Sequence, residues 1–303
     1  MVSVSVVIPT LGRTERLRRA IESVTAQTVL PDSMIVVDGS DDGAAKPLVS
    51  DQNLPFDCTY TLQDGDGGPS EARNIGIEAT DAELVAFLDD DDHWHPKKLE
   101  TQLDAYDRLG AGLIFCGIEN VRLDGTVTNR SCPTAAPDAK SILVNDGIGS
   151  PSAVLVRRED AEAVGGFDEA FPVREDWEFY VRLLQVTEAA AVPEPLVTKE
   201  YNPEGLSRNV ELAERYIMKI HEKHREKYDA ELTRKFKRNN HFILGRRYAK
   251  AGKTAQARSH FSTSLSNGFQ VKTALYLFAS CLGPWGYESI RKISRRLRVG
   301  QSA

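Results

Sequence analysis

The chain has 303 residues, of which 41% are hydrophobic and 27% charged, a balance typical of a soluble globular protein with a buried core. Its four cysteines, Cys58, Cys116, Cys132 and Cys281, lie far apart and form no CxxC pair, so the sequence suggests neither a zinc site nor a disulfide framework. The longest apolar stretch, 274–282, is too short to cross a bilayer, and the first residues lack a signal-peptide pattern, so we expect a cytoplasmic protein.

The net charge of −6 is unevenly distributed along the chain. Residues 1–200 hold 17 Lys and Arg against 36 Asp and Glu, a net −19, whereas residues 201–303 hold 21 against 8, a net +13. This asymmetry predicts two domains, 1–205 and 206–303, with different partners. Nucleic acid is not expected as a partner, because the acidic two thirds would repel it.

The first 200 residues alternate between strand and helix patterns. Strands are expected at 2–8, 34–37, 58–62, 84–88, 113–116 and 153–156, with a hairpin turn at Asp124-Gly125, and helices at 15–26, 69–79, from 96 onward, at 158–164 and around 175–184. Such alternation predicts an α/β fold with a mainly parallel central sheet. In such sheets, ligands bind beyond the carboxyl ends of the strands.

Four consecutive aspartates, Asp89 to Asp92, follow the apolar strand 84–88. Like charges side by side repel each other, and a cation relieves that repulsion. Aspartate oxygens are hard ligands that suit Mg²⁺ or Mn²⁺, and an ion held by few protein groups commonly binds phosphate oxygens as well. A solvated acidic turn is the simpler alternative for an acidic run taken alone.

Three loops are predicted to meet at the same edge of the sheet: Pro9 to Arg13, the loop at Asp38, and Asp89 to Asp92. The first strand is followed by neither GxGxxG nor GxxxxGK[ST], which argues against a dinucleotide fold or a P-loop. A faint calcium-loop pattern starting at Asp64 fails, because its twelfth position is Ile75.

The last third is predicted to be helical from about residue 209. A first helix is expected to bury one stripe, formed by Leu212, Tyr216, Ile220 and the stem of Lys223. Two later stripes predict a helical hairpin similar to one tetratricopeptide unit; they are Leu244, Tyr248 and Gly252, then Ala257, Phe261, Leu265 and Gly268. One such unit cannot stack into a solenoid, so we expect a lid or an appendage packed on the catalytic domain.

Six motifs occur in an order that resembles family 2 inverting glycosyltransferases of the GT-A fold. They are VSVVIPT at 4–10, VVDGS at 36–40, GPSEARNIG at 68–76, FLDDDDHWHPKKLE at 87–100, GGFDE at 165–169 and EDWE at 175–178. The resemblance covers about residues 1–200 and implies a nucleotide-sugar donor and one divalent cation, Mn²⁺ or Mg²⁺.

The resemblance also implies a role for each matching residue. For the donor these are Pro9, Thr10 and Arg13 beside the base, Asp38 at the uracil or ribose, Arg73 near the base and phosphates, Asp89 facing the ribose, and Asp90 beside it. Asp91 is implied as the main metal ligand, with Asp92 as the neighbour that can substitute for it. Asp176 matches the catalytic base. The family more often has two acids where this chain has Asp38 and then Gly39, which leaves the base of the donor open.

The chemistry of sugar transfer agrees with these roles. Loss of a nucleoside diphosphate builds negative charge on a phosphate oxygen, which a metal neutralises. The attacking hydroxyl must lose a proton, and one carboxylate serves as base. A single base without a carboxylate nucleophile predicts inversion at the anomeric carbon.

Two other functional classes remain open. A nucleotidyltransferase also uses an α/β fold and acidic metal ligands. It usually needs a phosphate loop rich in Gly and in Lys or Arg after the first strand, and P-T-L-G-R at 9–13 has only one Gly and one Arg. An interaction protein built on a degenerate transferase fold is the non-enzymatic alternative, which a missing Asp91 or Asp176 would have favoured.

The basic C-terminal end predicts contact with an anionic membrane. Apolar residues at 275–285 precede a basic cluster, Arg291, Lys292, Arg295, Arg296 and Arg298. We expect peripheral binding to the cytoplasmic face of the plasma membrane, near a glycan acceptor or one linked to polyprenyl phosphate. A basic helical face that only packs on the acidic domain is the alternative.

Overall fold

The structure is a computed structural model that describes residues 2–50, 53–65, 67–122, 124–200 and 209–282. The chain divides into two compact units, Met1–Ile142 with Asp146–Pro203, and Leu143–Asn145 with Glu204–Ala303. The predicted boundary between residues 205 and 206 lies outside the described residues, as does the basic cluster at 291–298.

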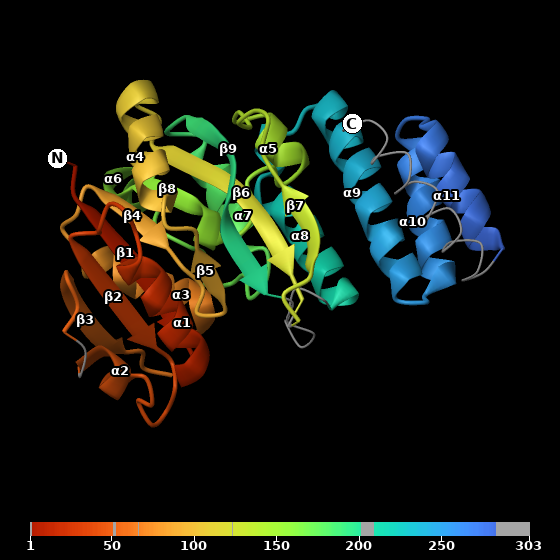
Figure 1. The fold of residues 1–303 in the computed structure, drawn as a ribbon. Coiled ribbons are helices and arrows are strands. Elements are labelled where there is room, and N and C mark those ends of the chain that lie inside the picture. Colours follow the sequence, from red (N-terminus) through yellow and green to blue (C-terminus); the bar gives the residue numbers. More distant parts are fainter. Residues whose placement is uncertain (1, 51–52, 66, 123, 201–208, 283–303) are drawn as a thin grey trace. The chain divides into compact units, whose positions relative to one another are not determined.

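The first unit begins with four parallel strands in the order β3-β2-β1-β4. They are β1 (Val4–Thr10), β2 (Ser33–Asp38), β3 (Asp57–Leu62) and β4 (Leu84–Phe87), and Figure 1 shows β1, β2 and β3 side by side. All seven residues of β1 are buried, as a β-branched strand inside a covered sheet requires. The strands expected in this half are confirmed.

Helices connect these strands and cover the sheet. They are α1 (Thr14–Thr25), α2 (Lys46–Ser50) and α3 (Gly68–Glu78). Helix α3 packs closely on β1 because Gly76 has no side chain: a Cβ there would lie 2.2 Å from Cγ1 of Val7. This close approach fixes Arg73, one turn earlier on α3.

The second half of the sheet is mixed. It contains β5 (Asp92–Trp94), β6 (Leu113–Val121), β7 (Val127–Ser131), β8 (Val154–Arg157) and β9 (Ala189–Glu200). Strand β8 runs antiparallel to both β4 and β6, β9 is parallel to β6, and β5 is antiparallel to β9. The expected α/β class is confirmed, with more antiparallel pairing than the alternation alone predicts. The hairpin of β6 and β7 is also confirmed.

The remaining helical segments of this unit are α4 (Lys98–Leu109), α5 (Ser141–Val144), η1 (Pro151–Ala153), α6 (Arg158–Ala163) and α7 (Glu175–Leu183). Three phenylalanine rings pack between β4 and α7. The ring of Phe167 lies 5.2 Å from Phe87 of β4 and 4.2 Å from Phe179 of α7, centroid to centroid. These ring contacts link the end of β4 to the helix that carries Asp176.

The second unit is helical and contains α8 (Val210–Lys223), η3 (Arg225–Lys227), α9 (Ala230–Lys250), α10 (Thr254–Ser266) and α11 (Val271–Cys281). The hairpin of α9 and α10 is confirmed, and a Cβ at Gly245 would lie 2.6 Å from the ring of Phe261. The stripe predicted for α8 is wrong, except at Ile220. Its other buried residues, Ala213 and Ile217, each lie one position later than predicted. No helix among the described residues is long and apolar enough to cross a membrane.

Candidate active site

The four aspartates after β4 point in two directions. Carboxylate oxygens of Asp89, Asp91 and Asp92 lie within 4.8 Å of one another, as metal ligands would. Asp90 instead contacts the loop after β1. The chain turns here, where the amide of Asp92 donates to the carbonyl of Asp89 at 3.0 Å, and continues into β5.

Asp90 holds the loop after β1. Its Oδ2 accepts from Thr10 Oγ1 at 2.7 Å, and its Oδ1 from Arg13 Nη2 at 2.5 Å. Burial raises the pKa of Asp90 to about 6, against the opposing charge of Arg13. Asp90 therefore joins Thr10 and Arg13, and all three are residues predicted for the donor. Pro9 lies beside them in β1, opposite Val37 of β2.

Asp38, at the end of β2, is buried and fully hydrogen bonded. Its Oδ1 accepts from the amides of Gly12 (3.2 Å) and Ser40 (3.0 Å), and its Oδ2 from the amide of Ala45 (3.0 Å) and the hydroxyl of Tyr60 (3.1 Å). Burial alone would raise the pKa of Asp38, but these hydrogen bonds outweigh it and lower the pKa. Asp38 thus joins the loops that follow β1 and β2.

Asp89, Asp91 and Asp92 form an acidic triad. A lysine that the sequence analysis did not identify contacts this triad. Lys199 Nζ in β9 donates to Asp92 Oδ2 at 2.8 Å and lies 3.5 Å from Asp89 Oδ2. Asp92 Oδ2 also accepts from Ser152 Oγ at 2.7 Å. The other oxygen of Asp92, Oδ1, is buried and has no hydrogen-bond partner among the described residues. A buried, unpaired carboxylate oxygen in a set of hard donors fits a divalent cation.

The pKa values of these carboxyl groups differ. Burial alone would raise the pKa of Asp89, but Arg73 and Lys199 outweigh it and lower the pKa to about 2. Burial raises the pKa of Asp92 to about 6. The positive charge of Lys199 opposes this shift, and the negative charge of Asp89 adds to it. The third member, Asp91, is partly exposed and lies 3.7 Å from Arg16 and 3.9 Å from Arg13.

Arg73 joins the triad to helix α7. Its side chain is 3% exposed; Nη2 donates to Asp89 at 2.6 Å and Nη1 to Glu175 at 3.1 Å. The guanidinium also lies 5.2 Å from the ring centroid of Phe167. Burial would lower the pKa of Arg73, but Asp89 and Glu175 outweigh it and raise the pKa. With both terminal nitrogens engaged, Arg73 links two parts of the site through protein contacts.

Asp176 lies in the first turn of α7. The residue before α7, Arg174, has φ 64° and is the single non-glycine residue with positive φ among those described, so the backbone is strained where α7 begins. Burial, together with the charges of Glu175 and Asp146, raises the pKa of Asp176 to about 8. One of its oxygens accepts from the amide of Trp177 at 2.7 Å. A carboxylate whose pKa lies near neutral pH suits general-base catalysis.

Sequence reasoning missed Glu175 as the partner of Arg73, Asp146 as a charge beside Asp176, and Lys199 and Ser152 as partners of Asp92. Glu175 stood in the EDWE motif beside the expected base, a signal that could have pointed to it. The other three carry no local pattern. Their places follow from strand pairing and loop paths.

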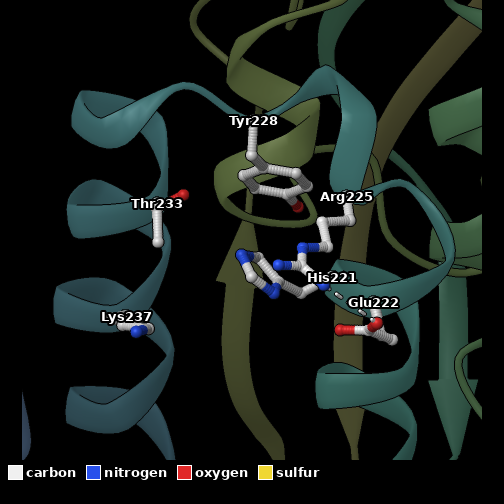
Figure 2. Close-up of a pocket in the computed structure, with 6 residues that line it drawn as sticks. All are labelled: His221, Glu222, Arg225, Tyr228, Thr233 and Lys237. Atoms are coloured by element: carbon white, nitrogen blue, oxygen red, sulfur yellow. Dashed lines mark ion pairs between the residues drawn. The ribbon is translucent and has the colours of Figure 1, made fainter.

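A cavity of about 500 Å³ in the second unit shares no residue with this site. Figure 2 shows its lining, His221, Glu222, Arg225, Tyr228, Thr233 and Lys237. The walls are largely paired with each other: the rings of His221 and Tyr228 lie 4.4 Å apart, and Arg225 lies 3.8 Å from Glu222. The candidate catalytic residues all belong to the first unit.

Curated relatives carry glycosyltransferase names. An uncharacterised glycosyltransferase of Haemophilus influenzae is 27% identical over 184 residues, covering 60% of this chain and 62% of that protein. The amylovoran biosynthesis glycosyltransferase AmsB of Erwinia amylovora is 27% identical over 192 residues, covering 60% and 64%. The chain thus spans less than two thirds of either relative.

Solved structures share the fold. S. aureus TarS 1–349 in complex with UDP-GlcNAc has a TM-score of 0.63 at 16% identity, covering 97% of this chain and 92% of that one. The mannosyltransferase PcManGT of Pyrobaculum calidifontis, in complex with GDP-Man and Mn²⁺, has a TM-score of 0.61 at 14% identity, covering 92% and 79%. These similarities confirm the expected GT-A fold.

Two family models match the chain. One, described as glycosyltransferase like family 2, matches residues 126–239. The other, described as glycosyl transferase family 2, matches residues 5–165, more than half of the chain. The chain therefore belongs to glycosyl transferase family 2.

Proposed function

We propose that this chain is a metal-dependent, inverting glycosyltransferase. It moves a sugar from a UDP-linked donor to a glycan or lipid-linked acceptor in the synthesis of a glycoconjugate or cell-surface polysaccharide. The observation that carries the proposal is the bridge of Arg73, whose guanidinium contacts Asp89 of the acidic triad and Glu175, the residue before Asp176.

The acidic triad is the proposed site of Mn²⁺ or Mg²⁺. Asp91 is the main ligand and Asp92 the second, with the unpaired Oδ1 of Asp92 in support of that assignment. When bound, the ion supplies the positive charge that a departing diphosphate needs, so the chain needs no acid for the leaving group.

The donor is assigned to the loops at the strand ends. The residues proposed to form the donor site, by contact or by shaping it, are Pro9, Thr10, Arg13, Asp38, Arg73, Asp89 and Asp90. Within this set, Asp38 and Asp90 already accept hydrogen bonds from protein donors, and we assign them to shaping the loops that bind the base and ribose. Arg73 likewise positions Asp89 and α7 rather than binding the phosphates itself.

Asp176 is the proposed general base. Its carboxylate takes the proton from the acceptor hydroxyl while that oxygen attacks the anomeric carbon and the nucleoside diphosphate leaves. Burial, with the charges of Glu175 and Asp146, raises the pKa of Asp176 enough for this transfer. One displacement without a covalent intermediate inverts the configuration.

The relatives support the donor and acceptor classes. TarS was solved with UDP and with UDP-GlcNAc, PcManGT with GDP-Man and Mn²⁺, and AmsB is named for amylovoran biosynthesis. The ligands of TarS and PcManGT support a nucleotide sugar as the proposed donor. The name of AmsB supports a polysaccharide or its lipid-linked precursor as the acceptor class.

Residues 206–303 form the proposed C-terminal domain, which places the enzyme on anionic membrane at the cytoplasmic face. In support, α11 exposes an apolar stripe at Val271, Leu275 and Phe278, which Leu282 continues directly after the helix; each is more than half exposed, and their spacing fits one helical face. A net charge of +13 in residues 201–303 favours an anionic surface.

Membrane contact is tested by sedimentation with liposomes that contain phosphatidylglycerol. We expect binding at low salt that weakens in Phe278→Glu and after removal of residues 284–303. Gln256→Glu, at an exposed position of α10, carries the same charge change and is the matched control. Wild-type protein that stays in the supernatant at low salt would contradict membrane contact.

The transferase proposal is tested with a panel of UDP-, GDP- and dTDP-sugars in the presence of Mn²⁺. Ligand-detected NMR identifies the donor that binds, and ¹H NMR of slow donor hydrolysis gives the configuration of the released sugar. We expect inversion. Release of pyrophosphate from a nucleoside triphosphate and a sugar phosphate would instead identify a nucleotidyltransferase, and no turnover of any donor would favour a non-catalytic protein.

A further inference from the structure

The pairing of β5 with β9 places a lysine on the acidic triad. Asp92 is the partner of Lys199 in this antiparallel register. The ammonium of Lys199 lies 2.8 Å from Asp92, 3.5 Å from Asp89 and 3.3 Å from Ser150 Oγ. Asp92 has a fully buried side chain, whereas that of Lys199 is 35% exposed, so the lysine is the member of the pair that has room to move.

The lysine and a divalent cation would be held by the same carboxylates. Both Asp89 and Asp92 contribute to the triad whose carboxylate oxygens lie within 4.8 Å of one another, and both contact Lys199. An ion at the triad would share these carboxylates with a positive ammonium, and charges of like sign at such separations repel. The unpaired, buried Oδ1 of Asp92 is the oxygen of that residue that stays available to the ion.

We infer that Lys199 is a built-in competitor of the divalent cation, which keeps the affinity of the triad for that ion low. The inference rests on the proposed function only in assigning the triad to a cation. Affinity for such ions depends on the net charge of the ligands, and the ammonium of Lys199 offsets part of the negative charge of the triad. Oxygens of a bound diphosphate supply further ligands, so the ion is held firmly when the donor is present.

The alternative is that Lys199 only neutralises buried carboxylates. The two roles predict different effects of Lys199→Met on the affinity for the ion. Loss of a neutralising charge lowers thermal stability in both cases, because Asp92 is left buried without its ion pair. A competitor also raises the affinity for the ion when it is removed, whereas a purely structural residue does not.

The test is a titration of the full chain with MnCl₂ alone, without nucleotide, in which free Mn²⁺ is followed by electron paramagnetic resonance. We expect Lys199→Met to bind Mn²⁺ about tenfold more tightly than wild type. In EDTA, the melting temperature of Lys199→Met should be lower than that of wild type. Added Mn²⁺ should raise the melting temperature of this variant more than that of wild type. Lys199→Arg, which keeps the charge, should bind Mn²⁺ as wild type does. Lys97→Met, at an exposed position, is the matched control and should change nothing.

Equal or weaker Mn²⁺ binding by Lys199→Met would overturn the inference. If that variant does not fold, Lys199→Gln gives the same comparison with a polar side chain on β9. Asp91→Asn separates this inference from the proposed function. Wild-type binding that Asp91→Asn abolishes and Lys199→Met leaves unchanged would overturn the inference alone, whereas no binding by any variant would overturn both.

Discussion

Arg73 donates from Nη2 to Oδ1 of Asp89 at 2.6 Å, from a side chain that is 3% exposed. The partner is the first of the four aspartates after β4, and the other arm of the guanidinium contacts Glu175. A planar, permanently charged fork is suited to bridging two carboxylates, which an ammonium cannot do with the same geometry. This bridge connects the proposed cation site with the proposed base.

Arg73→Lys should therefore disturb both sides of the site although it keeps the charge. We expect kcat to fall at least tenfold, because one ammonium cannot hold Asp89 and Glu175 together, and the melting temperature to fall with it. Removing one partner of a buried ion pair costs about 3–5 kcal/mol, so Arg73→Met should be the more damaging change. Arg108→Lys, on the exposed end of α4, is the control. Wild-type kcat in Arg73→Lys would refute the positioning role.

Asp176→Asn removes the proposed base and keeps its shape. We expect kcat to fall about 10²–10⁴-fold while donor affinity changes little, because the residue acts on the acceptor hydroxyl. Donor binding is measured by ligand-detected NMR, and Asp107→Asn on the exposed face of α4 is the control. An active Asp176→Asn would mean that no base is needed, as with an acceptor that is itself an ionised phosphate.

The dependence of activity on pH follows from the raised pKa of Asp176. Burial, Glu175 and Asp146 raise this pKa to about 8, so the ionised form that accepts a proton increases as pH rises toward 8. We expect kcat/KM to rise with pH and to level off above about 8. Asp146→Asn removes a negative neighbour, which lowers the pKa of Asp176 and moves the rising limb to lower pH. A limb that Asp146→Asn leaves in place would contradict this assignment.

Acid should destabilise the second unit through a histidine pair. Nδ1 of His241 lies 2.8 Å from Nδ1 of His260, and burial with the charge of His260 lowers the pKa of His241 to about 4. The unfolded chain takes up this proton near pH 6.5, whereas the folded chain resists it until about pH 4. Stability from this group is therefore present above pH 6.5 and lost as pH falls toward 4. The melting temperature should fall less between pH 7.5 and pH 5 in His241→Gln than in wild type. An equal fall in both would show that His241 is not the source of the acid sensitivity.

Much of the first unit could be predicted because its signals are local. The β-branched run of β1 and the apolar run of β4 each carry a strand pattern within one segment, and the rule for parallel sheets brings their carboxyl ends together. The acidic residues after β4 therefore had an expected place before any contact was known.

Contacts set by distant pairing could not be predicted. Lys199 is separated from Asp92 by 107 residues, and it belongs to β9, whose Pro193 and Pro195 weaken the strand signal. The three-residue strand β5 was hidden within the acidic motif. The split of Asp90 from its three neighbours depends on a backbone turn, so spacing in the sequence does not reveal it.

The most direct test of the account is turnover of the donor identified by NMR, with Mn²⁺ and with EDTA, in wild type and in Asp91→Asn. Asp107→Asn is the folded control with the same chemical change. The account predicts that EDTA abolishes turnover, that Mn²⁺ or Mg²⁺ restores it, and that Asp91→Asn loses most of it while melting like the control. Undiminished turnover in EDTA would contradict the central claim that the triad of Asp89, Asp91 and Asp92 holds a catalytic cation.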